Sequence, residues 1–411
     1  MRTFTQIVLF AIAAQVVVNA EENWPRFRGP NGSGHSTQKG IPSEFKADDL
    51  EWSIDLPGKG HSSPVIWGDN LFVTSGTETG ERILQCLDAN TGTERWKVSQ
   101  QFGANHLHKK NSYASGTPAV DGEHVVVAFA DEEHYRVTAY TFKGEQLWTQ
   151  DLGSFNSQHG QGVSPIIYEG MVIVPNDQWG PSALVAFDVT SGKEMWKSDR
   201  RFIKTSYATA MIMNVKGKDQ IIALSGGVGL AGIDPETGKQ IWASGELPQR
   251  TVASPMATQD GRVIGVCGQG GRGVIMVAVD PTGEGDVSQT HIKGTRETNI
   301  PYVPTPVIDG HYMYLWNDDG IVCCVDLAGD LGENVWRQRV GGNFSGSPVL
   351  IDGRLFCISE DGDVVVVQAS PEYKLLGKSS LGESSYSTPA VANGRVYFRT
   401  FHKLMCLKAK G

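Results

Sequence analysis

The chain has 411 residues, with 49 glycines, 36 Lys plus Arg against 45 Asp plus Glu, and a formal net charge of −9 at pH 7. This acidic balance, with no basic stripe along the chain, excludes a nucleic-acid backbone as the expected partner, because that electrostatic contact needs a cationic face. The many glycines among short runs of Val, Ile and Thr predict numerous short strands joined by tight turns.

The first 20 residues have the pattern of a cleaved export signal. Arg2 gives an early positive charge, residues 7–18 form an apolar run interrupted only by Gln15, and small residues end at Ala20 before Glu21. The apolar run is shorter than the roughly 20 residues that a membrane-spanning helix needs. We therefore expect a signal peptide over residues 1–20 and an exported protein, periplasmic or extracellular, without a membrane span.

Residues 21–49 precede the first repeat and are expected to form an N-terminal arm. Trp24, Phe27 and Arg28 are its expected anchors against the rest of the protein. The arginines of the arm could instead be presented to a partner, and the sequence leaves this choice open.

Two phrases then recur along the chain. The first, as in "GTPAVDGEHVVV" (116–127), places a small polar residue and a proline before an apolar strand, a glycine turn and a second apolar strand. Its proline position falls at 64, 118, 165, 255, 306, 348 and 389, with Ala210 in the same slot of one further copy. These spacings of about 41 to 54 residues lie in the range of propeller blades.

The second phrase is an acidic turn that ends in a tryptophan, as in "DANTGTERW" (88–96). In each copy the Asp can accept hydrogen bonds from turn amides, the Gly supplies a left-handed backbone position, and the Trp provides a flat body that wedges between neighbouring units. We therefore interpret the phrase as a docking motif between a third and a fourth strand. Its residues are Asp88, Gly92, Trp96, Asp188, Gly192, Trp196, Asp234, Gly238 and Trp242.

The two ends of the repeat region complement each other. The eighth unit, from Tyr386, stops after its third strand, and "LEWSIDL" (50–56) is a strand that belongs to no unit. Pairing the two would close the ring without exposed sheet edges. The sequence thus predicts an all-β fold, a single eight-bladed β-propeller of four-stranded antiparallel blades over residues 50–411, closed by an N-terminal strand that completes the last blade.

The motif in "CLDANTGTERW", "AFDVTSGKEMW" and "GIDPETGKQIW" resembles the tryptophan-docking motif of pyrroloquinoline-quinone-like (PQQ-like) β-propeller repeats, and the resemblance covers the whole mature chain. Residues 23–36, "NWPRFRGPNGSGHS", are similar to the leader of secreted bacterial members of this family that have no assigned activity. The same repeat occurs in quinoprotein dehydrogenases and in the outer-membrane assembly scaffold BamB, so the resemblance implies a fold and leaves the function open.

The dehydrogenase branch of this resemblance implies a quinone held between a tryptophan and a disulfide of adjacent cysteines, with calcium and a catalytic Asp. Cys323 and Cys324 are adjacent, but neighbouring strand side chains point to opposite faces. Cysteine in this chain is typical of a small buried strand residue. We expect no cofactor, with PQQ and calcium as the alternative. The disulfide state is left open for Cys86, Cys267, Cys323, Cys324, Cys357 and Cys406.

Blade topology indicates where a ligand would bind. The loops from second to third strands and the crossovers between blades meet at one end of the ring, which we call the crossover face, whereas the opposite end carries short hairpins that need only turn chemistry. Aromatic, imidazole, amide and charged side chains gather on the crossover face. The ligand-binding candidates are His61, His106, His108, Asn111, Tyr113, His159, Gln161, Asp177, Tyr207, Arg250, Tyr302, Asp318, Phe344, Glu360 and Tyr386.

Two hypotheses concern this face. Imidazoles of His61, His106, His108 and His159 could meet at the channel mouth and bind a transition metal, or they could hydrogen-bond to crossover backbones or face solvent. The aromatic and acidic rim could bind a sugar or peptide, or the aromatic rings could simply plug the channel. We assign no catalytic residue. The expected function is a non-catalytic binding or scaffold propeller for exported or envelope proteins or a small ligand or glycan, with a PQQ- or metal-dependent quinoprotein-like oxidoreductase as the alternative.

Overall fold

The computed structural model describes residues 23–104, 106–202 and 204–410. The expected signal peptide at residues 1–20 lies outside these ranges. Within them, no helix combines the length and the apolar character needed to cross a membrane.

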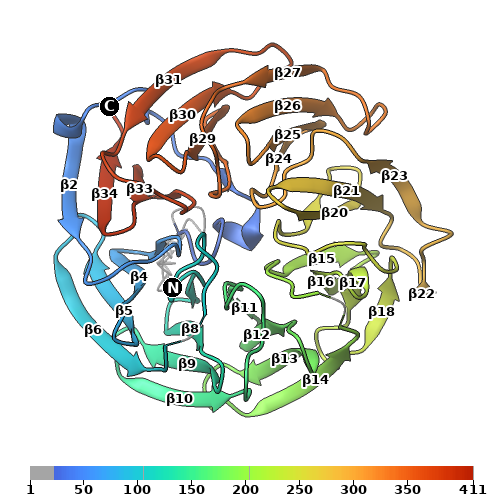
Figure 1. The fold of residues 1–411 in the computed structure, drawn as a ribbon, viewed down its shortest axis with the longest axis horizontal. Helices are drawn as coiled ribbons and strands as arrows, with labels where there is room; N and C mark the ends of the chain where they lie inside the picture. The colour runs from blue at the N-terminus through green and yellow to red at the C-terminus, as the bar shows by residue number, and fades with distance from the viewer. Residues whose placement is uncertain (1–22, 105, 203, 411) are drawn as a thin grey trace, which may run out of the picture.

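Eight β-sheets surround one central axis as the blades of a propeller (Figure 1). Short first strands line the axis, and the fourth strands, six of which carry a tryptophan, form the circumference. In sheet order, blade one contains β3 (Val65–Trp67), β4 (Asn70–Gly76), β5 (Glu81–Asp88) and β6 (Glu94–Gln101), and blade two contains β7 (Ala119–Val120), β8 (His124–Ala130), β9 (Tyr135–Thr141) and β10 (Gln146–Asp151). Blade three contains β11 (Ile166–Tyr168), β12 (Met171–Asn176), β13 (Ser182–Asp188) and β14 (Glu194–Arg200), and blade four contains β15 (Met211–Val215), β16 (Lys218–Ser225), β17 (Gly229–Ile233) and β18 (Gln240–Ala243).

The last four blades follow the same order. Blade five contains β19 (Met256–Ala257), β20 (Val263–Gln269), β21 (Arg272–Val279) and β23 (Ile292–Arg296), and blade six contains β24 (Val307–Asp309), β25 (Tyr312–Trp316), β26 (Ile321–Asp326) and β27 (Trp336–Arg339). Blade seven contains β28 (Val349–Ile351), β29 (Arg354–Ile358), β30 (Asp363–Gln368) and β31 (Leu375–Ser380), and blade eight contains β32 (Ala390–Ala392), β33 (Arg395–Arg399), β34 (Lys403–Lys408) and β2 (Leu50–Asp55).

Two further short strands and two 3₁₀ turns lie in the described part of the chain. β1 (His35–Ser36) adds in parallel to β28 at the inner edge of blade seven, and β22 (Gly285–Asp286) adds in parallel to β18 at the outer edge of blade four. The turns are η2 (Pro30–Gly32) and η3 (Ala47–Asp49).

The ring closes as the sequence predicts. β2 pairs antiparallel with β34, so that Trp52 lies opposite Cys406 and the N-terminal strand becomes the outer strand of the last blade. The predicted all-β, eight-bladed, four-stranded propeller is confirmed.

Tryptophan docking joins each of several blades to the next. The indole Nε1 of Trp96, Trp148 and Trp196 donates to a backbone carbonyl of the following blade, at 2.8 Å in each case. The ring lies against a glycine of that same turn; an added Cβ at Gly192 would lie 2.5 Å from Trp148. At the closing seam Trp52 donates to the carbonyl of Ala89 at 3.3 Å in the same manner.

Trp242 departs from this pattern. Its indole Nε1 donates to Gln220 Oε1 at 2.8 Å, which is a bond within its own blade. The connection between β21 and β23 of blade five carries β22, which pairs alongside β18 and places Gly285 opposite Trp242. Trp242 still belongs to a buried cluster that includes Val263 and Val279 of blade five.

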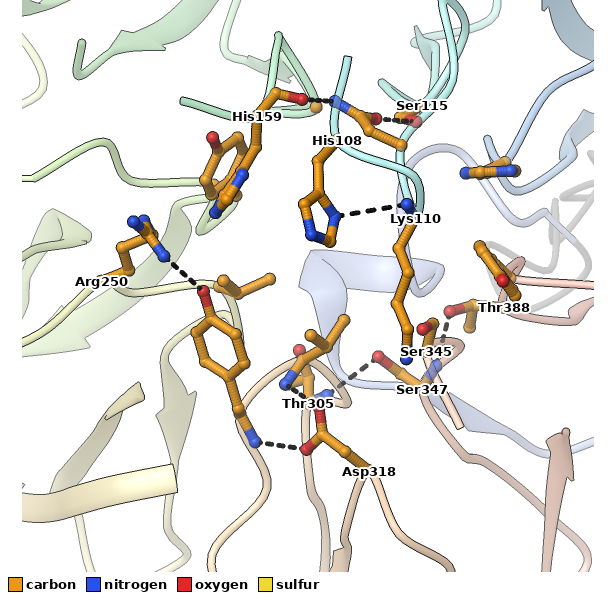
Figure 2. A pocket seen from close by; sticks show the side chains of 18 of the residues that line it. His108, Lys110, Ser115, His159, Arg250, Thr305, Asp318, Ser345, Ser347 and Thr388 are labelled. Carbon is orange, nitrogen blue, oxygen red and sulfur yellow. Dashed lines mark hydrogen bonds between the residues drawn. The ribbon is translucent and has the colours of Figure 1, made fainter. Parts of the chain in front are cut away.

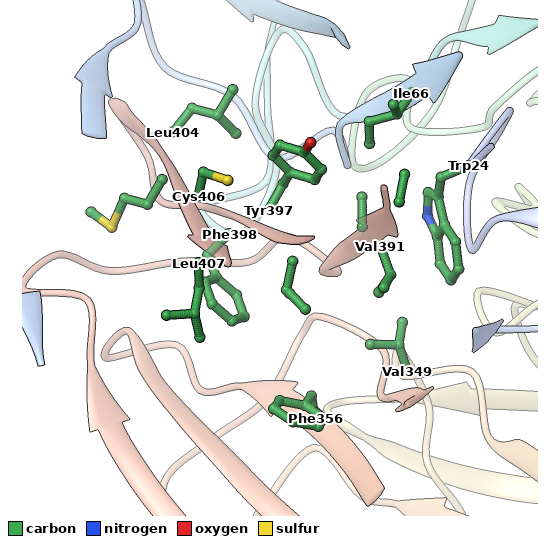
Figure 3. Close-up of a cluster of buried hydrophobic side chains, with 14 of the residues drawn as sticks. Trp24, Ile66, Val349, Phe356, Val391, Tyr397, Phe398, Leu404, Cys406 and Leu407 are labelled. Carbon is green, nitrogen blue, oxygen red and sulfur yellow. The ribbon is translucent and has the colours of Figure 1, made fainter. Parts of the chain in front are cut away.

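Buried apolar side chains fill the spaces between neighbouring blades. The largest such cluster includes Ile66 of blade one, Val391 of blade eight and Val349 of blade seven (Figure 3). Trp24 of the arm, only 1% exposed, belongs to the same cluster. The closing seam and the arm therefore share one hydrophobic core.

Candidate functional site

The N-terminal arm lies across one end of the channel that the ring encloses, and in Figure 1 its ribbon with η2 lies near the centre of the ring. Arg28 is 1% exposed, and its guanidinium donates to the carbonyls of Thr305, Pro306 and Pro348 at 2.7, 2.9 and 3.3 Å. Arg26 donates to the carbonyl of Ala210. Both arginines are thus held by inner strands of the ring rather than presented at the surface.

A cavity of about 600 Å³ occupies the axis at the crossover face (Figure 2). Phe27 of the arm is among its lining residues, so the arm forms one end of this axial pocket. The other lining residues come from crossovers, second-to-third-strand loops and the residues before each first strand: His61, His108, Lys109, Lys110, Asn111, Ser115, Thr117, Gln158, His159, Gly162, Ser164, Tyr207, Thr209, Arg250, Val252, Gly270, Gly271, Tyr302, Val303, Thr305, Asp318, Ser345, Ser347, Tyr386 and Thr388.

Hydroxyl groups from neighbouring blades connect around the pocket. At six positions around the axis, the hydroxyl before the proline of a repeat accepts a hydrogen bond from the backbone N–H of its counterpart in the preceding blade. Thr117 accepts from Ser63 at 3.0 Å, and Ser347 accepts from Thr305 at 2.9 Å. The same bond links Thr117 to Ser164, Thr209 to Ser254, Ser254 to Thr305 and Ser347 to Thr388. Because a hydroxyl is both acceptor and donor, each retains an O–H that can bond to a ligand.

Nine of the fifteen ligand-binding candidates line the axial pocket. These are His61, His108, Asn111, His159, Tyr207, Arg250, Tyr302, Asp318 and Tyr386. The crossovers and loops that the repeat pattern assigned to one face do bring them together. Whether they bind a ligand remains a proposal.

The other six candidates, His106 among them, do not line the pocket, and for four a packing or pairing role is visible. The ring of Tyr113 lies 3.9 Å from the guanidinium carbon of Arg82, and Gln161 donates to the carbonyl of Val163 at 2.7 Å. Asp177 forms a buried ion pair with Arg200 at 3.3 Å. Phe344 is fully buried against Trp316.

The sixth of these residues, Glu360, lies at the pocket rim. Its Oε1 accepts from Lys110 Nζ at 2.6 Å and from the Ser345 hydroxyl at 2.7 Å. Glu360 therefore acts on the pocket through Lys110 and Ser345, which line it. Sequence reasoning assigned neither of these two residues to the site, because the loops of blades one, six and seven that bring them together are far apart in the chain.

The four histidines of the metal hypothesis separate into different surroundings. The rings of His108 and His159 lie 4.5 Å apart between centroids. His61 instead packs against Tyr386 and Phe401, at 4.9 and 5.2 Å. Among the residues that the structure describes, no three or more His, Cys, Asp or Glu side chains are grouped so that they could hold a metal ion.

The residues present do not fit a quinone site of the dehydrogenase kind. Cys323 packs in the core between blades five and six and Cys324 in the core between blades six and seven, both as buried free thiols. Their side chains thus leave opposite faces of β26, as strand geometry requires, and neither lines the pocket. Asp318 is the one carboxylate among the lining residues, which is a poor donor set for calcium.

Asp318 is an unusual carboxyl group within this pocket. It is 6% exposed and accepts hydrogen bonds from the backbone N–H of Tyr302 at 2.7 Å and Val303 at 3.3 Å. Burial nevertheless raises the pKa of Asp318 to about 7, against the lowering effect of those amides and of Lys110. Near neutral pH this side chain therefore exchanges between its charged and neutral forms.

This pKa predicts a pH-dependent stability difference between the wild type and Asp318→Asn. The pKa of Asp318 in the folded protein lies above the ordinary aspartate value of 3.8, which applies to the unfolded chain. Between about pH 4 and 7 the folded protein therefore binds more protons than the unfolded chain. The stability that Asp318 contributes falls as pH rises through that window. Relative to Asp318→Asn, the wild type should lose at most about 4 kcal/mol across the window. Urea unfolding at pH 5 and pH 8 measures the difference.

The exposed neighbour Asp319 provides the matched control, since Asp319→Asn removes a carboxylate of the same loop that bonds to Arg339 at the surface. If the difference in free energy of unfolding between the wild type and Asp318→Asn stayed the same over the whole pH range, the prediction would be contradicted.

Comparisons with known proteins identify the family and the fold. A family model described as outer membrane protein assembly factor BamB matches residues 79–330 and 271–370, together more than half of the chain. The chain is 28% identical over 163 residues to polyvinylalcohol dehydrogenase of a Pseudomonas species, a match that covers 36% of this chain and 24% of that protein. It is 26% identical over 193 residues to BamB of Burkholderia pseudomallei, covering 46% and 43%. The chain thus spans less than half the length of either curated relative.

Solved structures show the same fold at low sequence identity. Quinohemoprotein alcohol dehydrogenase ADHIIG from Pseudomonas putida HK5 aligns with a TM-score of 0.70 at 12% identity, over 97% of this chain and 83% of that one. BamB from Moraxella catarrhalis aligns with a TM-score of 0.60 at 14% identity, over 88% and 97%. Both proteins share the propeller architecture with this chain.

Proposed function

Since the chain belongs to the PQQ-like propeller family whose model is described as outer membrane protein assembly factor BamB, we propose that it is an exported, non-catalytic binding propeller that holds a small ligand in its axial pocket. The observation that carries this proposal is the pocket itself. It is closed at one end by the arm, it measures about 600 Å³, and it is lined by tyrosine, imidazole, amide and hydroxyl groups. Convergent polar groups around a concave site of this size are typical of ligand binding.

Unsatisfied polar groups support the same proposal. His61 is 8% exposed, and its Nε2 makes no hydrogen bond within the described part of the chain. The Nδ1 of His159 is buried without a partner as well, within the same limits. Buried polar atoms normally find partners because leaving them unpaired costs about 1–3 kcal/mol. A bound ligand could supply these partners.

The alternative function is a quinoprotein-like oxidoreductase, which the similarity to polyvinylalcohol dehydrogenase favours. That match covers only 24% of the relative's length. The opposed cysteines of β26 and the single lining carboxylate count against a quinone and calcium centre in this pocket. A binding function needs neither group.

Filling the pocket tests the proposed function. Val252 lines the pocket, so Val252→Trp should occupy much of its volume without removing a side-chain hydrogen bond. We expect native mass spectrometry of protein isolated from the exported fraction of its own organism to show a small-molecule adduct on the wild type and none on Val252→Trp. Val335→Trp, at a side chain 43% exposed, is the matched control and should retain the adduct.

Two results would count against this function. An adduct that survives in Val252→Trp would place the ligand elsewhere. Oxidation of alcohols by the wild type with a dye acceptor, lost in Val252→Trp, would instead favour the oxidoreductase.

A further inference from the structure

The axial pocket is strongly asymmetric in charge. Lys109, Lys110 and Arg250 line it together with one carboxylate, Asp318, although the chain as a whole carries a net charge of −9. Figure 2 shows His159, His108 and Lys110 following one another along one side, with Arg250 beside His159 and Asp318 across the pocket. We call Lys109, Lys110 and Arg250 the cationic wall of the pocket. Its positive charge contrasts with the acidic net charge of the whole chain.

Arg250 and Lys109 line the pocket without a carboxylate partner among the described residues, and of the two only Arg250 is held in place by side-chain hydrogen bonds. Its guanidinium donates to the amide oxygen of Gln158 and to the hydroxyl of Tyr302 at 3.4 Å, both of which are neutral groups. Lys110, by contrast, pairs with Glu360 at 2.6 Å. Because carboxylate and sulfate groups match the fork of an arginine, Arg250 offers an anion its strongest single contact.

The pKa values of two histidines are lowered by the positive charges of this wall in addition to burial. Burial, followed by the charges of Arg250 and of His108 and His106, lowers the pKa of His159 to about 4. Burial, followed by Lys109, Lys110 and Arg250, lowers the pKa of His108. Burial, together with cations on two crossovers, thus disfavours the charged form of two imidazoles in one pocket. An anion in the same place would reverse this effect.

The remaining lining groups suit a frame rich in hydroxyls. The hydroxyls of Thr117, Ser164, Thr305, Ser347 and Thr388 each accept a backbone amide, and none of them donates to an acceptor in the parts of the chain described. Tyr207, Tyr302 and Tyr386 add aromatic surface. Hydroxyl donors and tyrosine rings are the groups that bond to and stack on a sugar.

From these observations we infer that the axial pocket binds a small organic anion, an acid group on a hydroxyl-rich frame such as a hexuronic acid, with Arg250 contacting the acid group and the hydroxyl ring contacting the frame. The inference rests on the proposed binding function and names the class of ligand. Lys109 and Lys110 add to the attraction without needing to touch the ligand.

Glucuronate and glucose test the inference because they differ by one carboxylate. Calorimetry should give glucuronate a dissociation constant at least about tenfold below that of glucose for the wild type, a ratio that corresponds to about 1.4 kcal/mol. In Arg250→Met the ratio should fall close to one. Lys218→Met removes a positive charge at the start of β16, on the hairpin face away from the pocket, and should keep the wild-type ratio. Glucose 6-sulfate in the same series distinguishes a carboxylate site from a sulfate site.

A second readout follows the histidines directly. Proton NMR titration should show that glucuronate raises the pKa of His159 above its value in sodium chloride of equal ionic strength, with the resonance assigned by a His159→Gln variant. Arg250→Met should remove the extra shift. Equal binding of glucose and glucuronate would overturn the anion inference and leave the binding function standing. An unchanged His159 titration with glucuronate and with glucose 6-sulfate would overturn it as well, whereas an adduct missing from the native protein would count against the binding function itself.

Discussion

Gly192→Ala is expected to lower the free energy of unfolding by about 3 kcal/mol. Gly192 has φ of +71°, where a side chain costs roughly 1–2 kcal/mol, and its new Cβ would lie 2.5 Å from the ring of Trp148. Trp148 would have to move, which weakens its 2.8 Å bond to the carbonyl of Val189 and overpacks the space between blades two and three at a further cost of about 1–3 kcal/mol. Denaturant unfolding followed by tryptophan fluorescence measures the loss.

Gly353→Ala separates the two contributions. Gly353 has nearly the same backbone, with φ of +69°, but an added Cβ would meet nothing within 4 Å. The variant should lose only the backbone cost of roughly 1–2 kcal/mol. Equal losses in the two variants would show that the tryptophan contact does not restrict position 192, and the docking account of the repeat would fail.

Arg28→Met is expected to destabilise the protein by at least about 3 kcal/mol and to weaken ligand binding with it. Methionine keeps most of the apolar length but removes the donors that satisfy five carbonyls: those of Gly32, Ser33, Thr305, Pro306 and Pro348. Each buried acceptor left unpaired costs about 1–3 kcal/mol, partly offset because a charge no longer has to be buried. Burial lowers the pKa of Arg28 to about 9, so the group is still charged at neutral pH. Thermal and urea unfolding measure the loss.

Arg95→Met is the control for this charge change. Arg95 pairs with Asp88 at 2.6 Å on the surface, and such exposed pairs contribute about 0–1 kcal/mol. Losses of similar size in the two variants would mean that the arm does not depend on Arg28 for its place at the end of the channel.

The fold could be predicted from the sequence because nearly the same strand and turn pattern recurs in each blade. The glycine and the tryptophan of the docking motif lie within one short sequence phrase. The closing strand also carries a tryptophan, Trp52, which packs beside Gly92 in the same way as the other docking tryptophans pack beside glycines. Trp242 is the exception: the connection of blade five beside it carries β22, which is only two residues long and has no repeat signal.

The candidate site could be predicted only in part. Blade topology correctly placed the crossovers at one end, but position on that face does not decide the direction of a side chain. Phe344 packs against Trp316 in the core between blades six and seven, and Asp177 forms a buried ion pair with Arg200 of its own blade. The small polar residue before each proline served only as part of the repeat pattern, although the recurrence of Ser or Thr there in every blade was a signal for the hydrogen bonds that link six of these positions around the axis. The pocket's end, Phe27, depends on how the arm crosses the channel, which no local pattern specifies.

The most direct test of the account is a titration of the protein with PQQ in the presence and absence of calcium, followed by thermal stability. A binding pocket without a quinone and calcium centre predicts that calcium leaves any effect of PQQ unchanged. Saturable stabilisation that requires both, growing as RT ln(1 + [L]/Kd), would contradict it and identify the protein as a quinoprotein-like oxidoreductase.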